Sequence, residues 1–334
     1  MAFAYLLSAA PSGPGRDPKA HLDLEQMRAC ARADRFGAHR RVDDPREADL
    51  ILFVETSSAA GHYFELVRRH PTYREFARKS YLFSSTDKVV PFLPGVYASI
   101  ERRWYWPAWT RSGHYLGVKE RGALRYDPDR LPSRLFSFVG DAGTHPLRRR
   151  LMRLRHPDAI LIDTHSESLA IERGERPQML PEEYVARYAS AIADSAFVLC
   201  PPGGGTSSFR LFEAMMLGRV PVIVSDQWVP PDGPDWERVS VRITESEVET
   251  IPARLESLAA DAPAMGEAAR TAWLDWFSEG ASFHRTIEWC LDLARSAPAR
   301  AGLRRYAPYV QMLRPYHAAR SVAKRLGHGP SPSD

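Results

Sequence analysis

The sequence predicts an α/β protein with two doubly wound parallel sheets that face each other across a cleft. Three observations support this fold class. Short apolar runs alternate with amphipathic stretches in both halves of the chain, which is typical of parallel strands joined by helical crossovers. A charged, proline-containing segment at residues 120–134 separates the two series. The length of 334 residues suits about two domains.

The first half contains strand-like runs separated by helical patterns. The run at residues 48–54 is apolar throughout, as expected of a strand covered on both faces. The helix at residues 63–79 is expected to break at Pro71. In chain order, the expected elements are a strand at 3–8, a helix at 22–36, a strand at 48–54, the broken helix at 63–79 and a strand at 80–84.

The second half repeats this alternation after the charged segment. Pro181 occupies a favoured first helical position, and Gly218 is placed to end a helix. The expected elements are strands at 135–139, 159–163, 197–200 and 220–224, and helices at 146–155, 181–193 and 207–217. The predicted domains are therefore residues 1–133 and 134–296, followed by a basic helical tail at 297–334 whose end is disordered.

The composition is that of a globular protein, with 44% hydrophobic and 26% charged residues. A net charge of +4 is too small to indicate a nucleic-acid partner.

No apolar run approaches the roughly 18 residues of a membrane span. The apolar start at residues 2–10 lacks a basic region, so we interpret it as a strand and not as a signal peptide. The widely spaced cysteines Cys30, Cys200 and Cys290 fit neither a metal motif nor a disulfide framework, which favours the cytoplasm.

The tail is rich in arginine and has no acidic residue between Asp292 and Asp334. Apolar residues recur in it at helical spacing: Leu303, Tyr306, Val310 and Leu313. One interpretation is a helix that crosses back to the first domain. The other is peripheral contact with an anionic membrane at its inner face, or with a phosphate-bearing lipid-linked acceptor.

The most informative motif is a glycine loop between a strand that ends at Cys200 and the helix at 207–217. Three glycines are followed by three hydroxyl residues: Gly203, Gly204, Gly205, Thr206, Ser207 and Ser208. The glycines allow a positive φ and close approach of a ligand. The hydroxyl residues can cap the helix, whose free N–H groups and dipole favour an anion.

Two charged residues follow on the same helical face. Arg210 has the bidentate geometry that suits phosphate, and Glu213 can accept hydrogen bonds from the two hydroxyls of a ribose. The opposite face, with Phe209, Phe212 and Met216, is expected to be core. The loop is neither a P-loop nor a dinucleotide fingerprint. The plain alternative is a flexible turn with an Arg–Glu surface pair.

These residues resemble a known family. The run at 197–203, the Arg210-x-x-Glu213 motif and the segment 218–226 are similar to the carboxyl-terminal half of exostosin-type glycosyltransferases, glycosyltransferase family 47. Asp235-Trp236, the segments at 239–245 and 136–140, and, more loosely, 91–99 continue the resemblance. It covers roughly residues 47–277 and is specific at 197–226.

The resemblance implies two facing Rossmann-like domains in the GT-B arrangement, a nucleotide-sugar donor on the second domain, and inversion at the anomeric carbon. Arg210 would meet the diphosphate and Glu213 the ribose. The Gly-Arg-Asp-His pattern common in the family's first domain is reduced here to Arg111-Ser-Gly-His114, so the acceptor side lacks its motif. The full predicted donor set is Gly140, His145, Arg148, Gly203, Gly204, Gly205, Thr206, Ser207, Ser208, Arg210, Glu213 and Asp226.

The residues from Gly140 to Arg149 form a second glycine turn before a basic helix. Arg148 or Arg149 could neutralise donor phosphates there. The alternative is a solvated basic helix face.

Inverting transfer needs a general base that takes the proton of the acceptor hydroxyl. Glu55, Asp87 and Asp141 stand where polar loops follow predicted strands, and His62 and His114 are alternatives. Each carboxylate can also be a plain loop residue. The leaving diphosphate needs positive charge, which Arg210 and the helix N-terminus would supply.

A cluster of aromatic residues comprises Trp104, Trp106 and Trp109. Flat indole rings can stack on sugars and so could line an acceptor site, although core or domain-interface packing explains them equally well.

Together these features predict an inverting glycosyltransferase that uses a nucleotide-diphosphate sugar, with a UDP-sugar as the first candidate. Its acceptor would be a hydroxyl of a glycan, a lipid-linked molecule or a small molecule. We expect no metal site and no required cofactor, because the fold that the resemblance implies usually holds the diphosphate with backbone and basic groups, although a divalent metal could stimulate the reaction. The alternatives are a fucosyltransferase-like enzyme with a GDP-sugar donor and a non-catalytic sugar- or nucleotide-binding protein.

Overall fold

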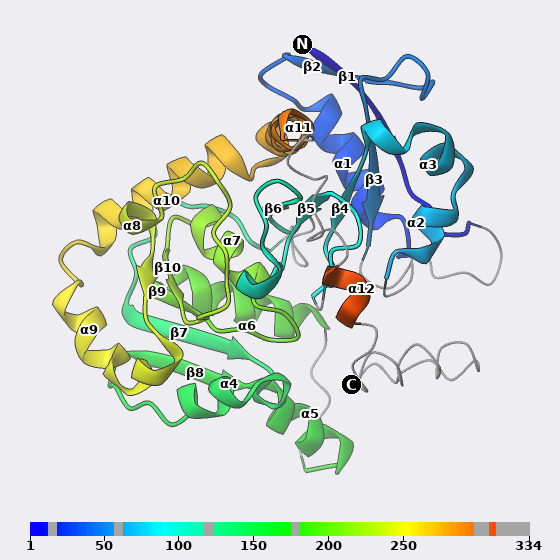
Figure 1. The fold of residues 1–334 in the computed structure, drawn as a ribbon. Coiled ribbons are helices and arrows are strands. Elements are labelled where there is room, and N and C mark those ends of the chain that lie inside the picture. Colours follow the sequence, from blue (N-terminus) through cyan, green and yellow to red (C-terminus); the bar gives the residue numbers. More distant parts are fainter. Residues whose placement is uncertain are drawn as a thin grey trace.

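A computed structural model describes residues 1–12, 19–56, 63–87, 89–116, 123–175, 181–296 and 307–311 (Figure 1). It contains a six-stranded sheet formed by the first half of the chain and a five-stranded sheet formed by the second half. Helices pack on both sheets, so the predicted fold class of two facing Rossmann-like units is confirmed.

The N-terminal sheet has the order β2-β1-β3-β4-β5-β6, and every neighbouring pair is parallel. Its strands are β1 (Ala2–Leu7), β2 (His39–Val42), β3 (Leu50–Glu55), β4 (Ser80–Ser84), β5 (Gly95–Tyr97) and β6 (Thr110–Ser112). Strand β3 is buried along its whole length between β1 and β4, which explains its continuous apolar run.

The helices of this half begin and end close to the predicted positions. They are α1 (Leu22–Arg32), α2 (Glu65–Arg69), α3 (Pro71–Phe76), η1 (Ala77–Lys79) and η2 (Arg102–Trp104). The predicted break at Pro71 is confirmed, because α3 starts there. His70 caps α3, and its imidazole accepts a hydrogen bond from the backbone N–H of Thr72.

The C-terminal sheet has the order β11-β10-β9-β7-β8 and is also parallel. Its strands are β7 (Arg134–Gly140), β8 (Ala159–Asp163), β9 (Ser195–Cys200), β10 (Val220–Ile223) and β11 (Val241–Arg242). The helices are η3 (Ala142–Thr144), α4 (Pro146–Leu151), α5 (Thr164–Glu172), α6 (Pro181–Ala193), α7 (Phe209–Met216), α8 (Trp236–Val239), η4 (Glu245–Thr250), α9 (Ile251–Ser257), α10 (Ala262–Trp276), α11 (Glu279–Arg295) and α12 (Ala307–Gln311).

Helix α11 returns to the first half of the chain. It packs against α1 and also contacts β5 and β6 of the N-terminal sheet. Its buried residues include Phe283 and Ile287. The predicted second domain, residues 134–296, therefore includes a helix that belongs in space to the first sheet.

Backbone contacts join the two units directly. Glu101 forms an isolated bridge with Trp228, and the backbone N–H of Arg102 donates to the carbonyl of Gln227 at 2.9 Å. The hydroxyl of Ser112 donates to the carbonyl of Val229 at 2.6 Å. The carboxyl ends of the two sets of strands are thus held close to each other.

Within the described ranges, no helix combines the length and the hydropathy that crossing a bilayer requires. Apart from residues 307–311, the basic tail at 297–334 lies outside the described residues, as does His62. The membrane contact of the tail and the cytoplasmic location therefore stay predictions.

Candidate functional site

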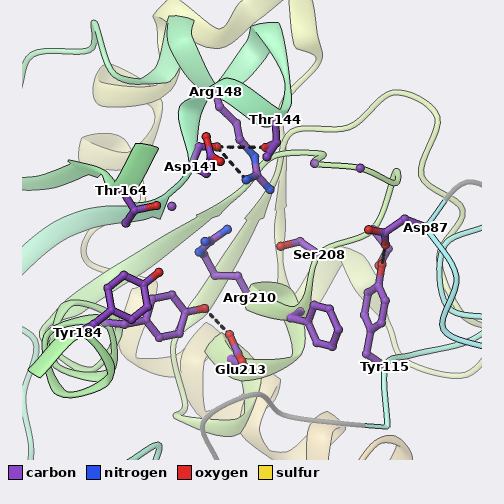
Figure 2. A pocket seen from close by; sticks show the side chains of 16 residues that line it. Asp87, Tyr115, Asp141, Thr144, Arg148, Thr164, Tyr184, Ser208, Arg210 and Glu213 are labelled. Atoms are coloured by element: carbon purple, nitrogen blue, oxygen red, sulfur yellow. Dashed lines mark hydrogen bonds between the residues drawn. The ribbon is translucent and has the colours of Figure 1, made fainter. Parts of the chain in front are cut away.

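A pocket of about 340 Å³ lies between the two units. The first unit contributes Asp87 and Tyr115, and the second contributes the remaining walls (Figure 2). The residues of the second unit that line it are Gly140, Asp141, Thr144, Arg148, Thr164, Tyr184, Tyr188, Gly203, Gly204, Ser207, Ser208, Phe209, Arg210 and Glu213. The structure thus brings together most of the predicted donor residues.

The glycine loop is pressed between the two units. A Cβ atom on Gly203 would lie 2.6 Å from a terminal nitrogen of Arg148, and one on Gly205 would lie 2.2 Å from the hydroxyl of Ser99. None of the three loop glycines has a positive φ. The expectation of left-handed backbone is therefore wrong here, and close packing alone explains the glycines.

The hydroxyl residues of the loop divide between two roles. Thr206 does not line the pocket, because its hydroxyl donates to the carbonyl of Ile100 in the first unit at 3.4 Å. Ser207 and Ser208 do line it, at the start of α7. The Ser207 hydroxyl is buried and has no hydrogen-bond partner within the described part of the chain, and the Ser208 hydroxyl makes no capping bond to α7. Both hydroxyls are therefore placed to serve a ligand.

Arg210 projects from the first turn of α7 into the pocket and is only 8% exposed. Its guanidinium donates to the carbonyl of Val139 and lies over the rings of Phe138 and Tyr188, with centroid distances of 4.7 and 5.7 Å. Its Nε is buried, and no residue that the structure describes accepts a hydrogen bond from it. Gly140 admits this side chain, since a Cβ there would lie 2.8 Å from the guanidinium.

Arg148 reaches the same place from α4. Its Nε donates to the carbonyl of Pro202 at 2.8 Å and a terminal nitrogen donates to the carbonyl of Asp141 at 3.1 Å. Burial, reinforced by the neighbouring charge of Arg210, lowers the pKa of Arg148 to about 10. Within the described residues, neither arginine forms an ion pair with a carboxylate. Two partly buried cations side by side are costly unless an anion joins them.

Glu213 lies one turn beyond Arg210 and is 2% exposed. It accepts a hydrogen bond from the hydroxyl of Tyr188, whose pKa is raised well above its usual value, chiefly by burial. Tyr184 and Thr164 line the pocket on the same side. Neither tyrosine was predicted from the sequence as a site residue, because helical spacing alone carries no signal for a pocket.

Phe209 corrects a second expectation. It was predicted to be core, yet it lines the pocket and stacks on Tyr115 of the first unit, with ring centroids 3.9 Å apart. An aromatic contact between the units therefore stands at the pocket wall.

The three predicted base candidates occupy different surroundings. Asp87 lines the pocket and accepts a hydrogen bond from the Tyr115 hydroxyl at 2.6 Å. Asp141 also lines it, caps η3 and accepts from the backbone N–H of Gly143 at 2.6 Å. Glu55 does not line it. This glutamate is fully buried, accepts from the Ala9 backbone N–H at 2.7 Å, and has its pKa raised to about 7 by burial.

Three further predicted donor residues lie outside the pocket lining: Gly205, His145 and Asp226. Gly205 packs against Ser99 and the backbone of Asp87. His145 caps α4, where it accepts from the backbone N–H of Leu147, and burial lowers its pKa. Asp226 is exposed and accepts from the backbone N–H of Glu245 at 3.1 Å. The structure assigns the side chains of His145 and Asp226 to local backbone contacts.

The predicted acceptor tryptophans are also outside the pocket lining. Trp104 packs against the core of the first unit. Trp106 and Trp109 stack at 6.1 Å, and the indole of Trp109 donates to the carbonyl of Pro91 at 2.9 Å. Their role in acceptor binding stays a prediction.

His114 is a core residue and not a base. It is 1% exposed, its Nε2 lies 2.8 Å from the hydroxyl of Ser282, and burial lowers its pKa to about 3. An imidazole so enclosed has no access to the pocket.

Comparison with known sequences confirms the resemblance to exostosin-type glycosyltransferases. The model of the exostosin GT47 domain matches residues 97–258. The exostosin-1 homolog of Caenorhabditis elegans is 29% identical over 157 residues, which cover 43% of this chain and 41% of that protein. The probable glucuronoxylan glucuronosyltransferase IRX7 of Arabidopsis thaliana is 38% identical over 89 residues, 26% of this chain and 20% of that protein. The aligned segments thus span less than half of either relative.

Solved structures of low sequence identity align over most of the chain. A sucrose-phosphate synthase from Thermosynechococcus elongatus is 11% identical with a TM-score of 0.43, covering 89% of this chain and 98% of that chain. HepE of Anabaena, in complex with UDP, is 12% identical with a TM-score of 0.38, covering 90% and 100%.

Proposed function

We propose that this protein is an inverting glycosyltransferase that moves a sugar from a nucleotide-diphosphate donor, in the first place a UDP-sugar, to a hydroxyl group. The single observation that carries the proposal is the pairing of Arg148 and Arg210. Both guanidinium groups enter one pocket beside the N-terminus of α7 and bond only backbone carbonyls in the described chain. The names of the exostosin and glucuronosyltransferase relatives point to the same reaction class.

The pocket has three sides that match the three parts of such a donor. The diphosphate belongs beside the two arginines and the Ser207 and Ser208 hydroxyls. The nucleoside belongs on the side of Tyr184 and Glu213, where an aromatic ring and a carboxylate meet. The sugar then points toward Asp87 of the first unit, which Figure 2 shows on the opposite side of Arg210.

In the proposed reaction, the acceptor oxygen attacks the anomeric carbon on the face opposite the diphosphate. The bond between the anomeric carbon and the diphosphate oxygen breaks, and Asp87 takes the proton of the acceptor hydroxyl. Arg148 and Arg210 stabilise the negative charge that develops on the leaving diphosphate. Asp87 is preferred to Asp141 because it lies on the first unit, across the pocket from both arginines.

The proposal is tested by a nucleotide screen. UDP, GDP, TDP and CMP are compared for their effect on the melting temperature of wild type, Arg210→Ala and Glu213→Ala. We expect UDP to raise the melting temperature of wild type, with a much smaller rise in both variants. A response to GDP alone would favour the fucosyltransferase-like alternative, and no response to any nucleotide would refute the donor site.

Transfer is then assayed with sugar conjugates of the nucleotide that binds, glucuronate included, and a broad panel of glycan and small-molecule acceptors. The proposal predicts donor hydrolysis or transfer that depends on Asp87. Nucleotide binding without either reaction would indicate the non-catalytic binding protein.

A further inference from the structure

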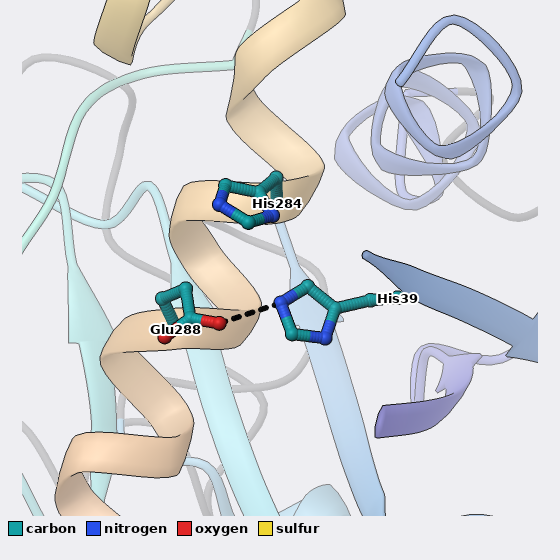
Figure 3. Close-up of side chains that lie close together, drawn as sticks. All are labelled: His39, His284 and Glu288. Atoms are coloured by element: carbon teal, nitrogen blue, oxygen red, sulfur yellow. Dashed lines mark hydrogen bonds and ion pairs between the residues drawn. The ribbon is translucent and has the colours of Figure 1, made fainter. Parts of the chain in front are cut away.

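Three side chains with metal-binding groups meet where α11 crosses the edge of the first sheet (Figure 3). His39 is the first residue of β2, and His284 and Glu288 stand one turn apart on α11. One potential ligand atom from each of the three lies within 4.8 Å of the other two. His39 Nε2 and Glu288 Oε1 are 2.7 Å apart. None of the three residues lines the pocket between the units.

The two imidazole rings are fixed by burial and stacking, but not all of their nitrogen atoms make hydrogen bonds. The side chain of His39 is 2% exposed, and His284 is 9% exposed. Phe36 stacks on His284 with centroids 4.1 Å apart and an interplanar angle of 14°. The Nδ1 atoms of both histidines are buried and have no hydrogen-bond partner among the described residues. A buried polar nitrogen without a partner is unfavourable, and a cation relieves this cost only at the nitrogen that it binds.

The donor set fits a divalent transition metal. Two imidazoles and one carboxylate form a common three-residue zinc set, and water completes the tetrahedron. The side chain of Glu288 is 40% exposed, which leaves a route for the ion and for that water. The nearby cation Arg35 is paired with Asp275, and Arg285 donates to the carbonyl of Asp275. Both guanidinium groups lie over the ring of Phe36, and the charge of Arg285 acts on His284 and Glu288.

We propose that His39, His284 and Glu288 bind a divalent transition metal, for which Zn²⁺ is the reference ion, and that this metal fastens α11 to β2. The ion would join residues 249 positions apart in the chain, His39 and Glu288. Its role is structural: it holds the crossing helix on the first sheet. The site takes no part in the proposed transferase reaction, so the two proposals are tested independently.

A matched control exists in the second unit. His156 and Glu256 form a His–Glu pair of similar geometry, with a distance of 2.9 Å and side chains that are 8% and 61% exposed. Among the described residues, no third metal-ligating side chain joins this pair. If the first cluster is only an ion pair, the two pairs should respond to zinc alike.

The experiment uses the full chain after treatment with a chelator and its removal. ZnCl₂ is titrated by calorimetry, and melting temperatures are recorded with zinc at about 100 times its dissociation constant. We expect one zinc per chain and a rise of about 5 °C in wild type. His284→Ala and Glu288→Gln should weaken binding at least tenfold and reduce the rise to about half or less, while His156→Ala should keep the affinity and the full rise.

Cobalt supplies a second readout that does not depend on stability. Co²⁺ bound in place of Zn²⁺ should give visible absorption bands of a low-coordinate site in wild type and in His156→Ala, and lose them in Glu288→Gln. Because Glu288 is half-exposed, that variant is expected to fold. Absence of saturable zinc binding, or equal affinity in wild type and Glu288→Gln, would overturn the proposal.

Discussion

Arg148 and Arg210 contact the same ring, that of Phe138, and donate to backbone carbonyls. Their contacts hold both guanidinium groups in place before any ligand arrives. The lowered pKa of Arg148 reflects burial and then the charge of Arg210. A pair of fixed, mutually repelling cations is poor for stability and well suited to a diphosphate, whose charge would relieve the repulsion.

Asp87 gives the first residue-scale prediction. Asp87→Asn keeps an oxygen that can accept the hydrogen bond of the Tyr115 hydroxyl but cannot take a proton. We expect the turnover number to fall about 10²- to 10⁴-fold, with nucleotide affinity changed by less than about threefold. Steady-state kinetics and calorimetry measure the two quantities. Asp141→Asn is the control, and a larger loss of turnover in that variant would assign the base to Asp141.

Glu55 gives the second residue-scale prediction, which concerns how the stability of the protein depends on pH. Burial raises the pKa of this carboxyl from 4.5 to about 7 in the folded protein. Between these values the folded state keeps a proton that the unfolded chain has released, so folding takes up a proton. The free energy of unfolding should therefore fall as the pH rises from 4.5 to 7, by about 3 kcal/mol from this group.

Glutamine cannot ionise, so Glu55→Gln should remove most of that pH dependence. Urea unfolding of wild type and variant at pH 5 and pH 8 measures it. From pH 5 to pH 8, the free energy of unfolding should fall less in the variant than in wild type. A smaller slope is expected to remain because burial also raises the pKa of Asp23. Stability curves that run parallel in the two proteins would contradict the burial of an ionisable Glu55.

At the scale of secondary-structure elements, the glycine loop packs closely against the first unit. Gly204 and Gly205 face the first unit, but what they would touch differs. A Cβ on Gly204 would lie 2.9 Å from a carboxylate oxygen of Asp87, which is a movable side-chain end. A Cβ on Gly205 would lie 2.7 Å from the backbone carbonyl of Asp87 as well as 2.2 Å from the Ser99 hydroxyl.

Alanine at these two positions should therefore have different effects on stability and on turnover. Gly205→Ala is expected to lower the free energy of unfolding by about 1–3 kcal/mol, because a fixed backbone must shift. Gly204→Ala should fold nearly as well as wild type but lose turnover, because the Asp87 carboxylate must move. Denaturant unfolding and kinetics test this, and equal stability losses in the two variants would show that the loop is not seated as described.

Much of the element order was predictable from the sequence. Apolar runs as long as that of β3 and breakers such as Pro71 and Gly218 are local signals. They placed β1, β3, β4 and β7 to β10, and the helices α1 to α4, α6 and α7, whereas α5 and α8 to α11 were not predicted. The short strands β2, β5, β6 and β11 were not predicted, because each has only two to four residues and depends on its neighbours in the sheet.

The site was predictable where its residues are contiguous. Arg210 and the serines beside it belong to one motif, and all line the pocket. Tyr184, Tyr188 and Phe209 follow an amphipathic pattern that cannot distinguish a core from a pocket wall. The cluster at His39 was unpredictable for another reason, since its members are brought together only by the path of α11.

At the scale of the whole molecule, one hydrophobic cluster extends through both units. It includes Leu24 and Met27 of α1, Phe283 of α11, and Phe212 and Met215 of α7. The crossing helix α11 therefore links the helices of the first sheet to the helix that carries Arg210. We expect the two units to unfold together and not as independent domains.

Phe283 tests this linkage because it is 1% exposed in that cluster. Phe283→Ala should cost about 3–5 kcal/mol and lower the unfolding midpoint of both units together. Leu274→Ala on α10 is the control, because Leu274 is 39% exposed and its loss should cost about 0.5 kcal/mol or less. Unfolding of the Phe283 variant in two separate steps would show that the units are independent.

The central claim is that the pocket between the sheets holds the diphosphate of a nucleotide sugar. Calorimetric titration of UDP into wild type, Arg210→Ala and Arg149→Ala tests it most directly, since Arg149 is an exposed neighbour of Arg148 on α4. We predict binding at one UDP per chain, a loss of roughly 10- to 100-fold in Arg210→Ala, and no more than about a twofold change in Arg149→Ala. Equal affinity in wild type and Arg210→Ala would contradict the claim.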